Sequence, residues 1–184
     1  ASTMPSVDEQ TSLYIDVLKA APAGKIIIRT IDAGSDKPVP FLALPHEENP
    51  ALGVRGFRLT AEHHEFQRSQ LTAIAKAIAA TGRDVGVMAP MVSTVSEVRE
   101  FKALCDEAGI TQVGIMIETP AIVPVMTDLV GLLSFVSIGT NDLSQYLFAA
   151  DRMHPRLGAL NDPWQPGLLR TIRTIAESAR SLGI

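Results

Sequence analysis

Charged and amide side chains follow several apolar segments of the chain, at positions where they could bind a phosphorylated ligand and a metal ion. Glu118 comes directly after the apolar segment 112–117, and Asn141 and Asp142 follow the apolar segment 134–138. A buried carboxylate is costly unless a cation or a hydrogen-bond donor satisfies it. Glu118 and Asp142 could share Mg²⁺, which takes carboxylate and substrate phosphate oxygens. The alternative is a structural role, in which Glu118 pairs with a structural arginine or caps the next helix and Asp142 caps a helix. The positions of the two residues alone do not favour either interpretation.

Three arginines form a second group of candidate binding residues. Arg29 ends an apolar segment, Arg55 lies in a long Gly/Pro-rich excursion at 33–56, and Arg152 follows the last polar cluster. A guanidinium has the planar shape that matches phosphate or carboxylate oxygens. For Arg55 and Arg152 a solvated or salt-bridged surface role is the alternative, whereas the position of Arg29 at the end of a strand favours a functional role.

The histidines and the single cysteine do not form a recognisable catalytic set. His46, His63, His64 and His154 lie in polar contexts without the spacing of metal ligands and without a partner nucleophile. Cys105 lies on the apolar stripe of a predicted helix, which favours a buried, inert thiol. One cysteine excludes an internal disulfide and fits a reducing compartment.

The elements that position these residues can be predicted from hydrophobic patterning. Buried strands are predicted at 26–28, 85–91, 112–117 and 134–138, which are rich in β-branched residues and show little polar alternation. Amphipathic helices are predicted at 8–20, 65–80, 94–108, 120–131 and 166–182. Thr94 and Glu97 have the spacing of a capping box, and Gly82 and Gly109 are expected to end helices.

The alternation of helices and strands predicts a parallel α/β sheet with right-handed crossovers. A doubly wound sheet is possible, although no strand is followed by a G-x-G-x-x-G turn. A (β/α)8 barrel needs eight strands, so a barrel would be represented here only in part. The excursion at 33–56 is long enough to be a functional loop.

Composition excludes several classes of protein. The chain has 184 residues, of which 46% are hydrophobic, and this fits one globular domain. Its formal net charge of −4 argues against a general nucleic-acid binder. No apolar run approaches the roughly 18 residues that a membrane span needs, and the N-terminal residues do not resemble a signal peptide. A cytosolic protein is therefore expected.

Five segments of the sequence carry a resemblance to a known family. They are 28–37, 48–58, 87–91, 114–121, and 137–146 with the pair 151–152. They resemble the phosphoenolpyruvate-utilising enzymes, and Gln145-Tyr146 with Asp151-Arg152 is most similar to enzyme I of the bacterial sugar phosphotransferase system. The resemblance runs in order from about residue 8 to residue 184 and is most specific between 137 and 152.

The resemblance implies a (β/α)8 barrel of the TIM type, with about four of its eight strands in this chain. Residues 1–184 would then be one partial phosphoenolpyruvate-binding domain, without a phosphohistidine domain. Mg²⁺ is the implied cofactor, with Glu118 and Asp142 as its ligands. The implied substrate-binding residues, by matching motif, are Arg29, Arg55, Asn141, Asp142 and Arg152. The family's proton-donor cysteine and its phosphohistidine would lie outside this chain, so no catalytic residue is expected within it.

The implied function is transfer of a phosphoryl group from phosphoenolpyruvate to a protein histidine, the first step of sugar uptake by the phosphotransferase system. A phosphohistidine domain and a histidine-containing phosphocarrier protein would be the partners, and the full-length protein would be a cytoplasmic homodimer. This chain alone would not be fully active. The alternatives are a barrel like that of pyruvate phosphate dikinase or phosphoenolpyruvate synthase, a catalytically incomplete dimerisation fragment, and a Mg²⁺-dependent aldolase or lyase.

Overall fold

The computed structural model describes residues 3–35 and 37–184, so residue 36, inside the first of the segments quoted above, lies outside the described residues. The strands are β1 (Ile26–Arg29), β2 (Val85–Ala89), β3 (Val113–Ile117) and β4 (Phe135–Ile138). The α-helices are α1 (Val7–Ala20), α2 (His64–Thr81), α3 (Val95–Ala108), α4 (Thr140–Leu147) and α5 (Pro166–Leu182). Four 3₁₀ helices are η1 (Pro50–Leu52), η2 (Gly56–Ala61), η3 (Pro120–Leu129) and η4 (Pro155–Leu157).

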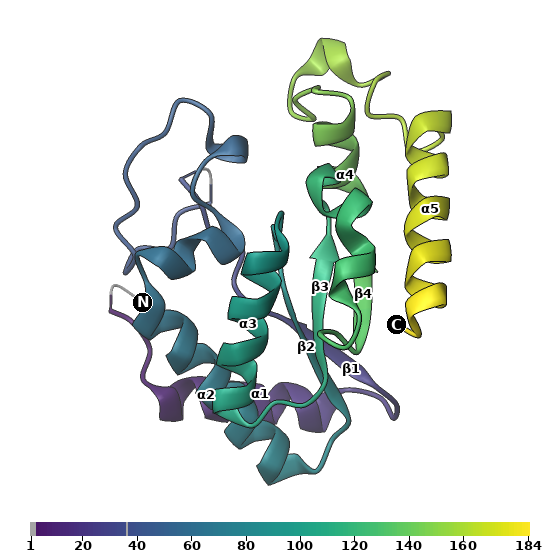
Figure 1. Ribbon diagram of the computed structural model, residues 1–184. Coiled ribbons are helices and arrows are strands. Elements are labelled where there is room, and N and C mark those ends of the chain that lie inside the picture. Colours follow the sequence, from purple (N-terminus) through teal and green to yellow (C-terminus); the bar gives the residue numbers. More distant parts are fainter. Residues whose placement is uncertain (1–2, 36) are drawn as a thin grey trace.

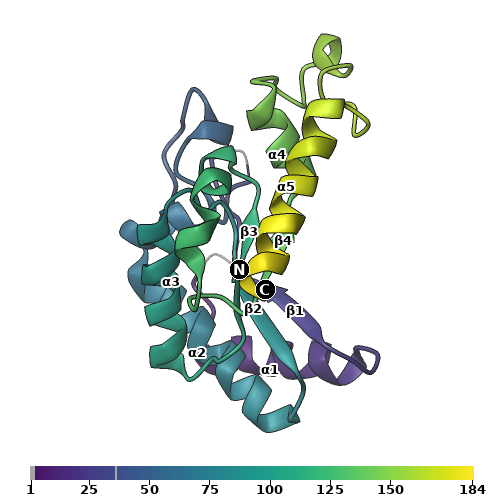
Figure 2. The same ribbon diagram turned by 45° about the vertical axis from the view of Figure 1, so that its right-hand side comes forward.

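The four strands form one parallel sheet in the order β1-β2-β3-β4, which is the order of the chain. Helix α1 packs on α2 and α2 on α3, while α5 runs beside β4 (Figures 1 and 2). This is half of a (β/α)8 barrel, and it confirms the predicted parallel α/β fold with about four of eight strands. None of the helices in the described part of the chain combines the length and hydropathy needed to cross a membrane.

Local sequence signals account for the ends of the predicted helices. The Thr94 hydroxyl accepts a hydrogen bond from the backbone N–H of Glu97 at 3.2 Å, and the Glu97 carboxylate accepts from the backbone N–H of Thr94 at 2.8 Å. This is the predicted capping box. Gly82 and Gly109 follow α2 and α3 with φ of 63° and 80°, a left-handed conformation that glycine adopts without a steric penalty.

The segment after β3 differs from the prediction. An α-helix was expected at 120–131, but the structure has the 3₁₀ segment η3, with a kink at Val125 (φ −108°). Pro124 lacks a backbone N–H, and its ring clashes with the preceding helical turn, so a continuous α-helix cannot form. The short helix α4, which follows β4, was not delimited by the hydrophobic pattern.

The ring of Phe135 covers the inner face of the sheet at Gly86 and Gly114. Gly86 and Gly114 leave space for the ring of Phe135, because a Cβ at Gly114 would lie 2.5 Å from that ring and one at Gly86 2.6 Å from it. The Lys25 ammonium lies 5.3 Å from the centre of the same ring. The phenyl ring therefore fills the interior near the start of the strands, and open space remains at their carboxyl ends.

The described part of the excursion between β1 and α2 contributes to a small hydrophobic core separate from the main one. Leu42, Leu59 and Phe66 are buried together, with Ala33 beside them. The backbone N–H of Gly56 donates to the Ala33 carbonyl at 3.1 Å and closes the excursion at its base. The excursion is thereby held beside the carboxyl ends of the strands, and its role as a functional loop stays a prediction.

Candidate functional site

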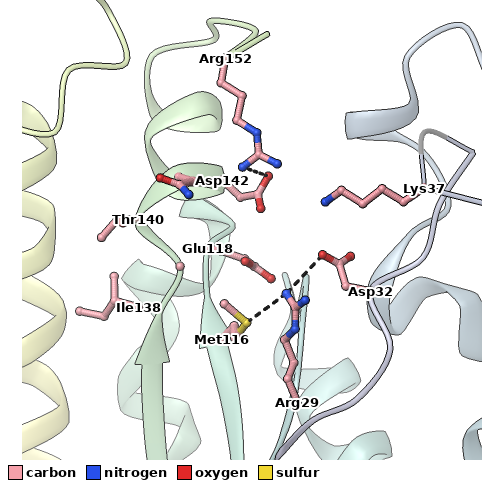
Figure 3. A pocket seen from close by; sticks show the side chains of 11 residues that line it. Arg29, Asp32, Lys37, Met116, Glu118, Ile138, Thr140, Asp142 and Arg152 are labelled. Atoms are coloured by element: carbon pink, nitrogen blue, oxygen red, sulfur yellow. Dashed lines mark hydrogen bonds and ion pairs between the residues drawn. The ribbon is translucent and has the colours of Figure 1, made fainter.

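A pocket of about 380 Å³ lies at the carboxyl ends of the strands, the end at which parallel α/β folds place their active sites. It is lined by Arg29, Asp32, Lys37, Met116, Glu118, Ile138, Gly139, Thr140, Asn141, Asp142 and Arg152. Figure 3 shows Glu118, Asp142 and Arg152 on the β3–α4 side of this space, with Asp32 and Lys37 facing them from the excursion. Four of the five predicted substrate-binding residues and both predicted metal ligands therefore line one pocket.

Glu118 directly follows β3. Gly114 and Met116 lie on the face of β3 that is turned to the barrel interior, and Glu118 continues this alternation of faces. Its Oε1 accepts a hydrogen bond from the backbone N–H of Met91 at 2.7 Å, and the residue is 1% exposed. Gly139 lies against the carboxylate, because a Cβ there would approach Oε2 to 2.5 Å. Among the described residues, Glu118 forms no ion pair with an arginine, and η3 has no side-chain cap.

The charged groups near the Glu118 carboxylate are two acids, Asp142 and Asp32, and one base, Arg29. Burial is the main cause that raises its pKa to about 7, and the nearby carboxylates of Asp142 and Asp32 raise it further. The Met91 N–H and Arg29 act in the opposite direction and do not compensate. A buried acid with acidic neighbours fits a cation site, because a bound cation would stabilise the charged form.

Asp142 lies in the first turn of α4, where the helix dipole favours a negative charge. Its Oδ1 accepts a hydrogen bond from Arg55 Nη1 at 3.3 Å and lies 3.5 Å from Arg152 Nη1. No side-chain bond of Asp142 caps α4, which begins after Gly139. The same oxygen is thus held between two guanidiniums, one from the excursion and one from the segment after α4.

Arg55 is the most buried of the predicted binding arginines, with 2% exposure. Its Nε donates to Asp32 Oδ1 at 3.2 Å and its Nη2 to Asp32 Oδ2 at 2.8 Å. Burial alone would lower the pKa of Arg55, but its bonds to Asp32 and the charge of Asp142 outweigh burial and raise it. Arg55 does not line the pocket, and it holds Asp32 and Asp142 in position from behind the pocket wall.

Arg29 and Arg152 are the guanidiniums that face the pocket. Their side chains are 41% and 28% exposed, so a ligand can reach them. Arg29 Nη1 lies 3.3 Å from Asp32 Oδ2 and 3.7 Å from the Met116 sulfur. The two arginines enter the pocket from opposite sides (Figure 3). Such an arrangement can bind an anion between them.

Asn141 is an exposed residue of the first turn of α4 and lines the same pocket. It stands next to Asp142 in the chain, at the amino end of a helix where backbone N–H groups remain available to an anionic ligand. The role in holding a ligand that the resemblance implies for Asn141 stays a prediction.

Six residues that line the pocket were not predicted as site residues, namely Asp32, Lys37, Met116, Ile138, Gly139 and Thr140. Asp32 and Lys37 lie in the segment 28–37 and Met116 in the segment 114–121, which carried the resemblance without a binding role for these three side chains. Only the spacing of Arg29 and Asp32, three residues apart at a strand end, could have pointed to a pair. Nothing local to Lys37 indicates that the excursion folds back over the strands.

The donor set allows a metal ion held by two protein carboxylates. Within residues 3–35 and 37–184, no group of three or more His, Cys, Asp or Glu side chains is arranged to hold a metal ion. Glu118 and Asp142 both line the pocket, and Mg²⁺ commonly takes one or two carboxylates together with water and substrate oxygens. The two acids therefore fit an open Mg²⁺ site rather than a closed structural one.

Comparison with known proteins identifies a family and several relatives. The model of the family described as "PEP-utilising enzyme, PEP-binding domain", where PEP is phosphoenolpyruvate, matches residues 1–184. A phosphoenolpyruvate-protein phosphotransferase of Streptomyces coelicolor is 42% identical over 184 residues, which is 100% of this chain and 33% of the relative. One from Bacillus subtilis is 39% identical over 192 residues, covering 98% of this chain and 33% of the relative.

A larger relative has a different name. A multiphosphoryl transfer protein of Rhodobacter capsulatus is 40% identical over 186 residues, which cover 98% of this chain and 22% of that protein. The chain thus spans about one third of the length of the two phosphotransferases and less of the multiphosphoryl transfer protein.

Proposed function

We propose a function on the premise that this chain belongs to the family of phosphoenolpyruvate-utilising enzymes, whose PEP-binding domain matches residues 1–184. The chain is the phosphoenolpyruvate-binding region of a phosphoenolpyruvate-protein phosphotransferase. The whole protein passes the phosphoryl group to a protein histidine, in the first step of the sugar phosphotransferase system. The names of the relatives from Streptomyces coelicolor and Bacillus subtilis support this assignment.

One observation carries the proposal: two accessible guanidiniums and two buried carboxylates line the same pocket. Arg29 and Arg152 supply forked hydrogen-bond donors for the phosphoryl oxygens. Phosphoryl transfer requires little covalent chemistry from the protein, and catalysis depends on positioning and on stabilising charge. Donors fixed before the reaction stabilise the charge that develops on the transferred group and on the departing enolate oxygen.

Glu118 and Asp142 are the proposed ligands of Mg²⁺. The bound ion would act as a Lewis acid that neutralises charge on the phosphoryl and enolate oxygens. Asn141 would orient the donor beside them, and Arg55 would keep Asp142 in place from behind the pocket wall. The Glu118 carboxylate is fixed by the Met91 N–H, so one of its oxygens already has a set position.

The partners of the whole protein are part of the proposal. By resemblance, a phosphohistidine domain receives the phosphoryl group and passes it to a histidine-containing phosphocarrier protein. The multiphosphoryl transfer protein of Rhodobacter capsulatus, similar to this chain over nearly all of it, favours a second architecture in which the same site works within a larger chain.

We also propose a cytoplasmic location and a homodimeric full-length protein. A single buried cysteine fits a reducing compartment. Met153, Leu160 and Trp164 are exposed on the connection between α4 and α5, which projects beyond the sheet in Figure 1. Exposed apolar side chains on one segment are typical of an interface, and light scattering of the chain measures whether it forms a dimer.

Calorimetric titration of the chain with phosphoenolpyruvate tests the proposed function. Binding is expected in Mg²⁺ and is expected to weaken at least tenfold in a chelator. Glu118→Gln should remove the dependence on metal, whereas Glu107→Gln, a change to an exposed residue of α3, should leave it intact. No binding at millimolar phosphoenolpyruvate in Mg²⁺ would reject the proposal for this chain.

A further inference from the structure

Lys37 extends from the excursion toward the pocket, from a backbone that is held on both sides. Its backbone N–H donates to the Gly34 carbonyl at 3.0 Å, and the Gly34 N–H donates to the Lys37 carbonyl at 3.4 Å. Ser35 Oγ bonds to Glu47 Oε2 at 3.4 Å, and the other Glu47 oxygen accepts from the Val54 N–H at 2.9 Å. The backbone of Lys37 is therefore fixed, and its side chain is the part that can move.

Lys37 differs from every other cation at the pocket in its contacts. Arg29 and Arg152, which line the pocket, and Arg55 behind it each contact an aspartate. Among the described residues, the Lys37 ammonium makes neither an ion pair nor a hydrogen bond, although it lines the pocket and faces its interior in Figure 3. An exposed ammonium that is not committed to an acid is available to an incoming anion.

The balance of charge between the pocket and an anionic donor indicates a binding role for Lys37. The pocket lining has three basic and three acidic residues, and Arg55 adds a further positive charge behind them. A phosphoryl group carries about −1.5 to −2 near neutral pH, and the carboxylate of the donor adds one more negative charge. With all these groups ionised and a divalent cation bound, the site carries about +3 when Lys37 is counted, which balances a fully ionised donor of about −3.

We propose that Lys37 is a substrate-binding residue that contacts the anionic phosphoryl donor when the donor occupies the pocket. The inference rests on the proposed function and adds a contact from the excursion to those from the strands. A lysine suits this position because its ammonium is a compact charge on a flexible stem and needs no fixed bidentate geometry. The donor is thereby held between the carboxyl ends of the strands and the excursion that covers them.

Binding measurements on variants of Lys37 test this inference. Lys37→Met should weaken phosphoenolpyruvate binding in Mg²⁺ about 10- to 100-fold, the usual range for loss of a charge-assisted hydrogen bond. Lys37→Arg should recover most of the affinity, because the positive charge is kept. The midpoint of thermal unfolding without ligand should stay unchanged in both variants, since the ammonium makes no ion pair or hydrogen bond with the described part of the chain.

Lys19→Met is the matched control. Lys19 is an exposed lysine in the last turn of α1, outside the pocket lining, so its removal changes the net charge equally without touching the site. The control should bind phosphoenolpyruvate like the unmodified chain. Equal affinities of the Lys37→Met and Lys19→Met variants would overturn the inference and leave the proposed function standing, whereas no binding by the unmodified chain would reject both.

Amine labelling gives a second measurement that needs no variant. Acetylation of the chain with acetic anhydride, read by mass spectrometry, should be slowed at Lys37 by phosphoenolpyruvate with Mg²⁺ and unchanged at Lys19. Inorganic phosphate with Mg²⁺ serves as a smaller probe and should protect Lys37 less. Labelling of Lys37 at the same rate with and without saturating phosphoenolpyruvate would contradict the proposed contact.

Discussion

Arg55 and Asp32 are joined by two parallel hydrogen bonds, from Nε to Oδ1 at 3.2 Å and from Nη2 to Oδ2 at 2.8 Å. Both side chains are almost completely buried, at 2% and 3% exposure. The pair connects the start of the excursion with its end, 23 residues later in the chain. The third nitrogen, Nη1, donates to Asp142, so one guanidinium connects both ends of the excursion with α4.

Asp32→Asn is expected to destabilise the chain by about 3 kcal/mol, since the buried Arg55 loses a charged partner that accepts two of its hydrogen bonds and keeps only Asp142. Urea unfolding followed by circular dichroism measures the change. Glu107→Gln is the control, because Glu107 pairs with Arg68 at an exposed surface and its loss should cost less than about 1 kcal/mol. Similar unfolding free energies for the two variants would show that the buried ion pair of Arg55 and Asp32 contributes no more to stability than a surface ion pair.

Arg55 and Arg152 contact the same oxygen of Asp142 but should respond differently to mutation. Arg152 is 28% exposed and lies 3.5 Å from Oδ1, so Arg152→Gln should weaken phosphoenolpyruvate binding while costing about 1 kcal/mol or less in stability. Arg55→Gln should cost about 3–5 kcal/mol, because it leaves Asp32 and Asp142 without their buried partner. Parallel unfolding and calorimetric titrations distinguish the two roles, and a larger loss of stability in Arg152→Gln would reverse them.

Local patterns predicted the parallel sheet, the capping box of α3 and the strand end at which Glu118 lies. Each of these depends on a few neighbouring residues or on a short hydrophobic period, and the sequence carries that information directly. The resemblance to a family pointed to Arg29, Asn141, Asp142 and Arg152, and the structure brings all four to one pocket.

The contacts that hold the site together could not be predicted in this way. The bond between Arg55 and Asp142 joins residues 87 positions apart, and the partner of Glu118 is a backbone N–H 27 positions away. Such partners follow from how segments distant in the chain pack at the carboxyl ends of the strands, which no local period encodes. The pattern at 120–131 failed for a different reason, because its apolar spacing suits a helix while Pro124 prevents one.

Cys105 should be unreactive in the folded chain. Burial is the main cause that raises the pKa of its thiol from the usual 9.0 to about 12, and the carboxylate of Asp106 adds to the shift. A thiol pKa that is higher in the folded state stabilises the fold below pH 9, and this contribution is lost as the pH rises from 9 toward 12. At pH 8, Ellman's reagent should react only as fast as the chain unfolds, with full reaction in urea. Immediate reaction of the native chain would contradict the buried thiol.

Gly139→Ala is expected to disturb the Glu118 carboxylate directly, because the added Cβ would lie 2.5 Å from Oε2 and 2.8 Å from the Glu118 Cβ. Neither atom can move far, since Oε1 is bound to the Met91 N–H and the Glu118 Cβ is attached to backbone that directly follows the buried strand β3. A crowded contact of this kind costs about 1–3 kcal/mol. The substitution should also abolish the dependence of phosphoenolpyruvate binding on Mg²⁺, because it displaces a proposed ligand.

The chain offers a matched control for this change. A Cβ at Gly158 would meet no atom within 4 Å, and its φ of −54° suits alanine, so Gly158→Ala should change neither stability nor binding. Thermal unfolding and titration with phosphoenolpyruvate, each with and without Mg²⁺, compare the two variants. If Gly139→Ala kept the metal dependence of the unmodified chain, the position of Glu118 against Gly139 would not matter for the site, and the proposed role of Glu118 as a metal ligand would lose its structural support.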